Sequence, residues 1–235
     1  MTTFGLVHGA WHGSWCWDLL AEELRGRGHH VVAADLPCED PTAGAEEYAQ
    51  VTIDALDGVP DSDVVLVAHS TGGLTIPVVA ERLAARDRPV RRLVFLAPLL
   101  PHPGRSSDQL QTSEPDRLMP GSGAGQVGHG DGSSTWQPHA AIATLFPDAP
   151  PRLAEWAAQR LRRQHWQVTR EITPLKAWPG SHVTVIACAA DAVVNPDWVR
   201  RTAGVRFGAE AHVLPGDHSP FLARPGQLAD LLLAG

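Results

Sequence analysis

The sequence predicts an α/β protein with a mostly parallel six-stranded sheet, helices on both faces of the sheet, and a lid inserted after the fourth strand. Short apolar, β-branched runs alternate along the chain with longer segments of helical periodicity. Several of the short runs are hydrophobic at almost every position, as parallel strands are when helices cover both faces. The length of 235 residues suits a single domain with a sizeable core.

Each expected strand is a short apolar run. The six runs are Phe4–His8, His30–Asp35, Asp63–Ala68, Arg92–Ala97, His182–Ala189 and Ala211–Leu214. Apolar side chains at helical spacing predict core helices at Trp15–Arg27, Gly44–Asp57, Gly73–Arg86, Pro196–Thr202 and Pro220–Leu233. Strands and helices that alternate in this order form parallel pairs through right-handed crossovers.

A long interval between the fourth and fifth strands interrupts this alternation. We therefore divide the chain into a core, residues 1–100 and 182–235, and an inserted lid, residues 101–181. Pro101–Gly132 is rich in Pro, Gly and Ser and is expected to be mostly loop. A flexible interdomain linker is the alternative, which the tryptophans and a predicted helix in this interval disfavour.

Two elements are expected inside the lid. Val127–Trp136 contains a Gly-Asp-Gly turn between short extended pieces, which indicates a small hairpin. Pro151–Gln164 begins with proline and carries apolar residues on one face, which predicts a helix.

Composition and charge narrow the class of partner. The net charge of −7 disfavours nucleic acid or an anionic membrane as the main partner. The sequence has no nucleotide-binding or zinc motif, so we expect no cofactor and no metal. The expected partner is a small-molecule substrate, and whether two copies form a homodimer is left open.

The cysteines and the absence of targeting segments favour a cytoplasmic protein. Cys16, Cys38 and Cys188 are odd in number and widely spaced, which is not a disulfide framework. No signal peptide and no apolar run long enough to cross a membrane is visible.

The strongest functional signal is the run from Val67 to Gly73, Val-Ala-His-Ser-Thr-Gly-Gly, which follows a strand and precedes a helix. A nucleophile elbow needs this context, because a sharp strand-to-helix turn lifts the serine hydroxyl above the sheet. Small residues two before and two after Ser70 let the turn close, and here they are Ala68 and Gly72. The alternative is that Ser70 only caps a helix.

A second signal, His8-Gly9-Ala10-Trp11, follows the first strand. In sites built around such an elbow, the turn after an early strand supplies one backbone N–H of the oxyanion hole, and the residue after the serine supplies the other. We therefore expect Ala10 and Thr71 to be the two donors. The side chain of His8 is interpreted as structural.

An acid and a base follow in the order that the elbow predicts. Asp191 ends the fifth strand, and His218 follows the sixth. All three side chains would meet at the carboxyl edge of the sheet, where ligand sites of open α/β sheets lie. A serine hydroxyl needs an imidazole to take its proton, and that imidazole needs a carboxylate to orient it. Ser70, His218 and Asp191 are therefore the predicted nucleophile, base and acid.

Other acids near these positions are less suitable. Asp217 adjoins His218 within one turn and is interpreted as a turn residue. Asp197 lies at a helix start and is interpreted as a cap or first-turn acid. The segment after the fourth strand, Ala97-Pro98-Leu99, contains no acid.

Aromatic residues are candidates for the pocket wall. The lid contains Trp136, Trp156, Trp166 and Trp178, which either line an apolar pocket or hold the lid to the core. The residues chosen as the candidate substrate pocket are Trp11, Trp136 and Phe221.

The chain resembles an α/β-hydrolase of the branch that holds plant methylesterases, hydroxynitrile lyases and short bacterial esterases. The resemblance is carried by four pieces that span nearly the whole chain: Leu6–Trp17, Arg27–Pro37, the elbow, and Asp217-His218-Ser219-Pro220. It implies six strands with a lid between the fourth and fifth. Lyases of the branch carry a lysine just after the catalytic histidine, where this chain has Ser219, and this departure disfavours cyanohydrin cleavage.

Together these features predict a serine hydrolase that cleaves a small or medium apolar carboxylic ester, lactone or thioester through an acyl-enzyme. Two alternatives stay open on the same fold: a lyase or cyclase that uses the triad without hydrolysis, and a small-molecule receptor.

Overall fold

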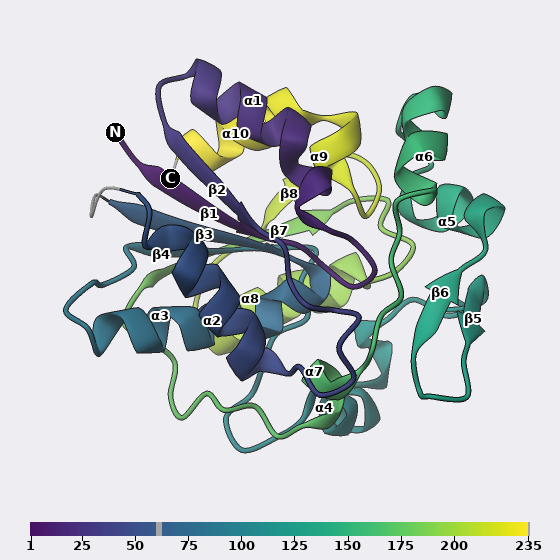
Figure 1. Ribbon diagram of the computed structural model, residues 1–235, viewed down its shortest axis with the longest axis horizontal. Coiled ribbons are helices and arrows are strands. Elements are labelled where there is room, and N and C mark those ends of the chain that lie inside the picture. The colour runs from purple at the N-terminus through teal and green to yellow at the C-terminus, as the bar shows by residue number, and fades with distance from the viewer. Residues whose placement is uncertain (60–62, 235) are drawn as a thin grey trace.

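The computed structural model describes residues 1–59 and 63–234, and its centre is one six-stranded parallel sheet (Figure 1). The strand order is β2-β1-β3-β4-β7-β8. The strands are β1 (Thr3–Val7), β2 (His30–Ala34), β3 (Val64–His69), β4 (Arg92–Leu96), β7 (His182–Cys188) and β8 (His212–Leu214). All five neighbouring pairs are parallel, so the predicted fold class is confirmed.

Helices cover both faces of the sheet (Figure 1). One face carries α1 (Asp18–Gly26), α9 (Pro220–Ala223) and α10 (Pro225–Leu233). The other carries α2 (Ala45–Leu56), α3 (Ile76–Ala84) and α8 (Pro196–Phe207). The strands β1 and β4 are buried at every residue because helices lie on both sides of them, which explains their continuous apolar sequences.

The predicted C-terminal helix, Pro220–Leu233, is two helices in the structure. It breaks at Arg224, whose φ of −142° and ψ of 46° lie outside the helical region. Proline at position 225 disfavours helical geometry in the residue before it, which accounts for the break.

The segment between β4 and β7 folds into short elements. They are α4 (Ser107–Ser113), the 3₁₀ helix η3 (Pro115–Arg117), β5 (Gln126–Gly128), β6 (Ser134–Trp136), α5 (Pro138–Leu145), α6 (Pro151–Ala158) and α7 (Gln167–Arg170). The predicted hairpin is present as the antiparallel pair β5–β6. The expectation of a loop at Pro101–Gly132 missed α4, which a capping box starts: Ser106 Oγ accepts from Gln109 N at 3.1 Å, and Gln109 Oε1 accepts from Ser106 N at 2.9 Å.

The helix predicted at Pro151–Gln164 ends at Ala158, because the residues that follow it bond to the core instead. Arg162 N donates to Trp11 O at 2.6 Å, and Gln164 Oε1 accepts from Trp11 N at 3.1 Å. Farther along, Glu171 Oε1 accepts from Ala45 N at the start of α2, at 2.6 Å. These bonds hold the inserted segment at the carboxyl ends of the strands, which the arrowheads mark in Figure 1.

Candidate active site

Ser70 directly follows β3 and is the first residue of η2 (Ser70–Leu74), in a strained turn. Its φ is +51°, in the left-handed region that non-glycine residues rarely adopt. Such strain persists only where the surrounding structure enforces it, and it is the geometry of a nucleophile elbow. The turn that the sequence predicts at Ser70 is therefore present.

Close backbone packing enforces this turn. A Cβ on Gly72 would lie 2.7 Å from His8 O and 2.8 Å from Val7 O, so only glycine fits there. A Cβ on Gly9 would lie 3.0 Å from Ser70 Cβ, which places the loop after β1 directly against the serine. From the other side, Leu99 N donates to Ser70 O at 2.9 Å.

Asp191 and His218 lie in direct contact at the carboxyl edge of the sheet. The His218 Nδ1–H group donates to Asp191 Oδ2 at 2.8 Å, and both side chains are buried. The other carboxylate oxygen, Oδ1, accepts from the N–H groups of Val193 at 2.7 Å and Val194 at 3.0 Å. These three bonds hold the carboxylate in place and orient the ring, with Nε2 as the nitrogen left to act.

His69 connects the serine turn to the loop that carries His218. Its Nε2–H group donates to His218 O at 2.9 Å, and the two ring centroids are 4.4 Å apart. Since His69 is bonded covalently to Ser70, this bond brings the His218 loop against the elbow. Residues 70, 191 and 218, which are far apart in the chain, thus gather in one region.

The two predicted oxyanion donors belong to residues of the cavity beside Ser70. Ala10 and Thr71 line the same cavity as Ser70. Thr71 is the second residue of η2, so its N–H has no partner within that helix. Within residues 1–59 and 63–234, Ala10 N has no hydrogen-bond partner either, whereas the next N–H, that of Trp11, is bonded to Gln164.

Three buried imidazoles, those of His8, His12 and His69, belong to the turn after β1 and to the elbow, and burial keeps them neutral. Burial lowers the pKa of His8 to about 4 and that of His12 to about 3. Burial also holds the pKa of His69 well below its usual value. The Nδ1–H groups of His8 and His12 donate to Gly9 O and Ala10 O, each at 2.8 Å. These bonds support the prediction that the side chain of His8 is structural.

The cavity beside Ser70 is small, about 100 Å³. Its walls include Trp11 and Trp166, with Gln126 and Ser122 as polar groups and Val193 next to the Asp191 loop. Of the three residues predicted for the pocket, Trp11 lines this cavity. Trp136 packs edge-on against Trp11 at 5.5 Å, and Phe221 is fully buried against Trp17 and His69.

Sequence reasoning missed the hydroxyl that organises the cavity wall. Ser134 Oγ accepts from Trp11 Nε1 at 3.1 Å and from Trp166 Nε1 at 3.2 Å, and it donates to Gln126 Oε1 at 3.5 Å. One serine therefore fixes two indoles and an amide of the wall. No local pattern marks Ser134, because the two indoles that it binds come from distant segments, and only Gln126 lies in the same hairpin.

The neighbouring acids are held elsewhere. Asp217 Oδ1 accepts from Ser219 N at 2.8 Å and Oδ2 from Asp148 N at 2.9 Å, as expected for a turn residue. Burial raises the pKa of Asp217. Asp197 lies in the first turn of α8, whose cap is Asn195.

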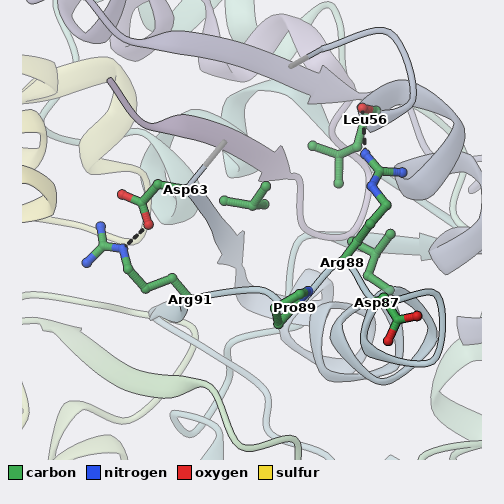
Figure 2. A pocket seen from close by; sticks show the side chains of 8 residues that line it. Leu56, Asp63, Asp87, Arg88, Pro89 and Arg91 are labelled. Atoms are coloured by element: carbon green, nitrogen blue, oxygen red, sulfur yellow. Dashed lines mark hydrogen bonds and ion pairs between the residues drawn. The ribbon is translucent and has the colours of Figure 1, made fainter. Parts of the chain in front are cut away.

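A second hollow lies at the opposite edge of the sheet, among Leu56, Asp63 and the segment from Asp87 to Arg91 (Figure 2). Arg91 pairs there with Asp63, and Arg88 bonds to Asp57 Oδ1 at 2.6 Å and to Leu56 O at 3.4 Å. Because these charges are already paired, we place the chemistry at the carboxyl edge.

Neither a metal centre nor a membrane span is found in the part of the chain that the structure describes. It contains no group of three or more His, Cys, Asp or Glu residues arranged to hold a metal ion. No helix among the same residues is long and apolar enough to cross a bilayer.

Comparison with known families decides the affiliation. The family model described as "Alpha/beta hydrolase family" matches residues 6–231. The chain belongs to this family. The prediction from sequence is thereby confirmed, and the elbow, the acid and the histidine lie at the sheet edge expected of an α/β-hydrolase.

Proteins similar to this chain include named esterases and a hydroxynitrile lyase. A carbendazim-hydrolysing esterase of Nocardioides sp. is 36% identical over 129 residues, an alignment that spans 51% of this chain and 50% of that protein. Methyl jasmonate esterase 1 of Vitis vinifera is 27% identical over 249 residues, covering 97% of this chain and 94% of that protein. An alpha-hydroxynitrile lyase of Arabidopsis thaliana is 36% identical over 106 residues, covering 42% and 40%.

Solved structures share the fold over the full length. A polyneuridine aldehyde esterase superposes with a TM-score of 0.81 at 20% identity, covering 100% of this chain and 98% of that one. A pyrethroid hydrolase of Sphingobium faniae JZ-2 gives a TM-score of 0.79 at 22% identity, covering 100% and 96%. At this level of identity, the likeness concerns the fold alone.

Proposed function

We propose that this α/β-hydrolase is a serine esterase that cleaves a small, apolar carboxylic ester, thioester or lactone through an acyl-enzyme. The observation that carries the proposal is the Asp191–His218 bond of 2.8 Å, at the sheet edge where Ser70 occupies a strained elbow. The similarity to proteins named esterases supports the reaction class.

The proposed mechanism assigns one role to each group. The Ser70 hydroxyl attacks the ester carbonyl while His218 Nε2 takes its proton. Asp191 keeps His218 in the tautomer that carries hydrogen on Nδ1 and stabilises the imidazolium that forms. The N–H groups of Ala10 and Thr71 hold the oxyanion. The leaving alcohol takes the proton from His218, and water then hydrolyses the acyl-enzyme by the same steps in reverse order.

The small cavity supports a small substrate. Its walls are mostly apolar or aromatic, and the polar lining residues are Ser70, Thr71, Ser122 and Gln126. The cavity volume of about 100 Å³ is below the range of typical ligand pockets, about 300 to 1,000 Å³, so the part of the substrate that it holds must be small. We therefore expect acetates or other short-chain esters to be the best substrates of the native enzyme.

Covalent labelling with a fluorophosphonate tests the proposal. The native protein should be labelled on Ser70, as intact-protein and peptide mass spectrometry would locate, and a Ser70→Ala variant should not be labelled. Equal labelling of both would refute the assignment of the nucleophile. A Ser122→Ala variant is the matched control, because it removes a hydroxyl from the same cavity without touching the elbow.

Two measurements on the native protein distinguish the esterase from the lyase or cyclase and from the receptor. Product mass should show the addition of water for an esterase, and no added water for a lyase or cyclase. A receptor would bind ligand without turnover and without a burst of released alcohol.

A further inference from the structure

Two cavities share one wall in this structure. The cavity of about 100 Å³ beside Ser70 and a second one of about 220 Å³ are both lined by Leu99, Leu118 and Trp166. The rest of the second cavity comes from the inserted segment, chiefly α4, η3 and α7. The two cavities therefore adjoin at these three residues, which we call the partition.

The backbone holds two of the three residues in place. Leu99 N donates to Ser70 O at 2.9 Å, which ties Leu99 to the elbow. Leu118 forms a bridge with Val194 on the Asp191 loop, and the next residue, Met119, donates its N–H to Val193 O at 2.9 Å. Moving either leucine would therefore disturb the elbow or the loop of the acid.

The indole of Trp166 is held by side-chain contacts instead. Its Nε1–H group donates to Ser134 Oγ at 3.2 Å, and its ring lies edge-on to Trp11 at 5.1 Å. These contacts place the largest side chain of the partition without using the backbone of the catalytic loops. Trp166 is thus the member of the partition that can be altered while the reacting groups stay in position.

We propose that Trp166 is a specificity-determining residue that limits the length of the substrate chain by closing the cavity beside Ser70 off from the second cavity. This inference rests on the proposed esterase function. Either cavity alone is smaller than typical ligand pockets, whereas the two joined through the site of the indole reach the lower end of that range. An ester with a longer unbranched chain would extend from Ser70 past position 166 into the second cavity.

The lining of the second cavity suits the end of such a substrate chain. Its lining is apolar where the partition forms it and polar where Gln111, Thr169 and Arg170 contribute. Asp108 and Arg117 line it as well, and the Arg117 guanidinium is engaged by Ser107 O and Oγ, both at 2.8 Å. Carbon atoms that pack against the apolar part of this lining would therefore gain burial.

The test is the chain-length profile of a Trp166→Ala variant. Initial rates would be measured with two homologous series, p-nitrophenyl esters from acetate to decanoate and acetate esters of alcohols from methanol to decanol. Each methylene that becomes buried is expected to raise kcat/KM by about fourfold. The variant should shift the preference toward longer chains in one series, and that series identifies the half of the ester that faces Trp166.

Two further variants keep the result interpretable. Trp166→Phe retains a ring beside Trp11 and should shift the profile in the same direction by less. Trp156→Ala is the matched control, because its indole packs on Trp15 at 5.2 Å and under Arg160 at 4.1 Å, outside both cavities. Its profile should equal that of the native enzyme.

The outcomes distinguish this inference from the proposed function. If both Trp166 variants are labelled on Ser70 and turn over short esters, yet keep the native profile in both series, Trp166 does not limit chain length and the inference is overturned. If the native protein is neither labelled on Ser70 nor active on any ester, the proposed function fails, and the inference with it.

Discussion

The neutral, buried imidazoles of His8 and His12 are predicted to make the stability of the fold depend on pH. His8 donates from Nδ1 to Gly9 O at 2.8 Å and accepts at Nε2 from Leu36 N at 3.0 Å. Protonation would turn that acceptor into a donor that faces a donor. His12 Nε2 is buried with no partner among the described residues, so a charge there would be unsolvated.

The sign and size of the effect follow from the pKa values. Burial lowers the pKa of His8 to about 4 and that of His12 to about 3, whereas the unfolded chain protonates both near 6.5. The stabilisation is therefore complete above about pH 6.5 and is lost as the pH falls toward 4 and 3. Lowering the pH from 7 to 5 should therefore reduce the free energy of unfolding by about 2 kcal/mol for each histidine, about 4 kcal/mol for His8 and His12 together.

Urea unfolding followed by tryptophan fluorescence measures this dependence at several pH values between 5 and 7. A His12→Gln variant removes one of the buried imidazoles, so the slope of unfolding free energy against pH should fall by about 1.4 kcal/mol per pH unit below pH 6, whatever the variant costs overall. The exposed His212, changed to Gln, is the control for losing an imidazole outside the core. A His12→Gln slope equal to the native slope would refute the reasoning.

Two further predictions concern the site itself. Asp191→Asn should lower kcat by about 10⁴ while circular dichroism stays native, because an amide no longer fixes the tautomer of His218; a loss below tenfold in esterase kinetics would contradict this role. Gly9→Ala would place a Cβ 3.0 Å from Ser70 Cβ and should cost about 1–3 kcal/mol of stability, with loss of esterase activity. Gly180→Ala has nothing within 4 Å of the added Cβ, and the two variants should differ in thermal unfolding; equal midpoints would contradict the packing argument.

Patterns within single segments were enough to predict the central sheet. Each strand was predicted to within one residue at either end. The central strands are buried on both faces and are apolar at nearly every position, and the more exposed edge strands β2 and β8 are also short apolar runs. The elbow was equally readable, because its turn demands small residues at fixed offsets from Ser70 and a strand before it.

Predictions for the inserted segment were poorer. The helix start at Ser106 carries a capping-box signal that was available in the sequence and was overlooked, whereas the early end of α6 carries none. That end is set by the bonds of Arg162 and Gln164 to Trp11, more than a hundred residues earlier in the chain. Local helix propensity cannot predict where a helix ends when hydrogen bonds to distant residues set that end.

The sequence was enough to predict the parallel sheet and the serine turn, because each depends on the spacing of residue types along one strand or turn. It also shows the chain order of Ser70, Asp191 and His218 directly. Three features could be known only from the folded chain: the contact of Asp191 with His218, the two indoles bonded to one Ser134 hydroxyl, and the place of Trp166 in the lining of two cavities. These are contacts between segments whose separation is set by how the whole chain packs. Side-chain packing across loops has no period, and so it leaves no pattern in the sequence.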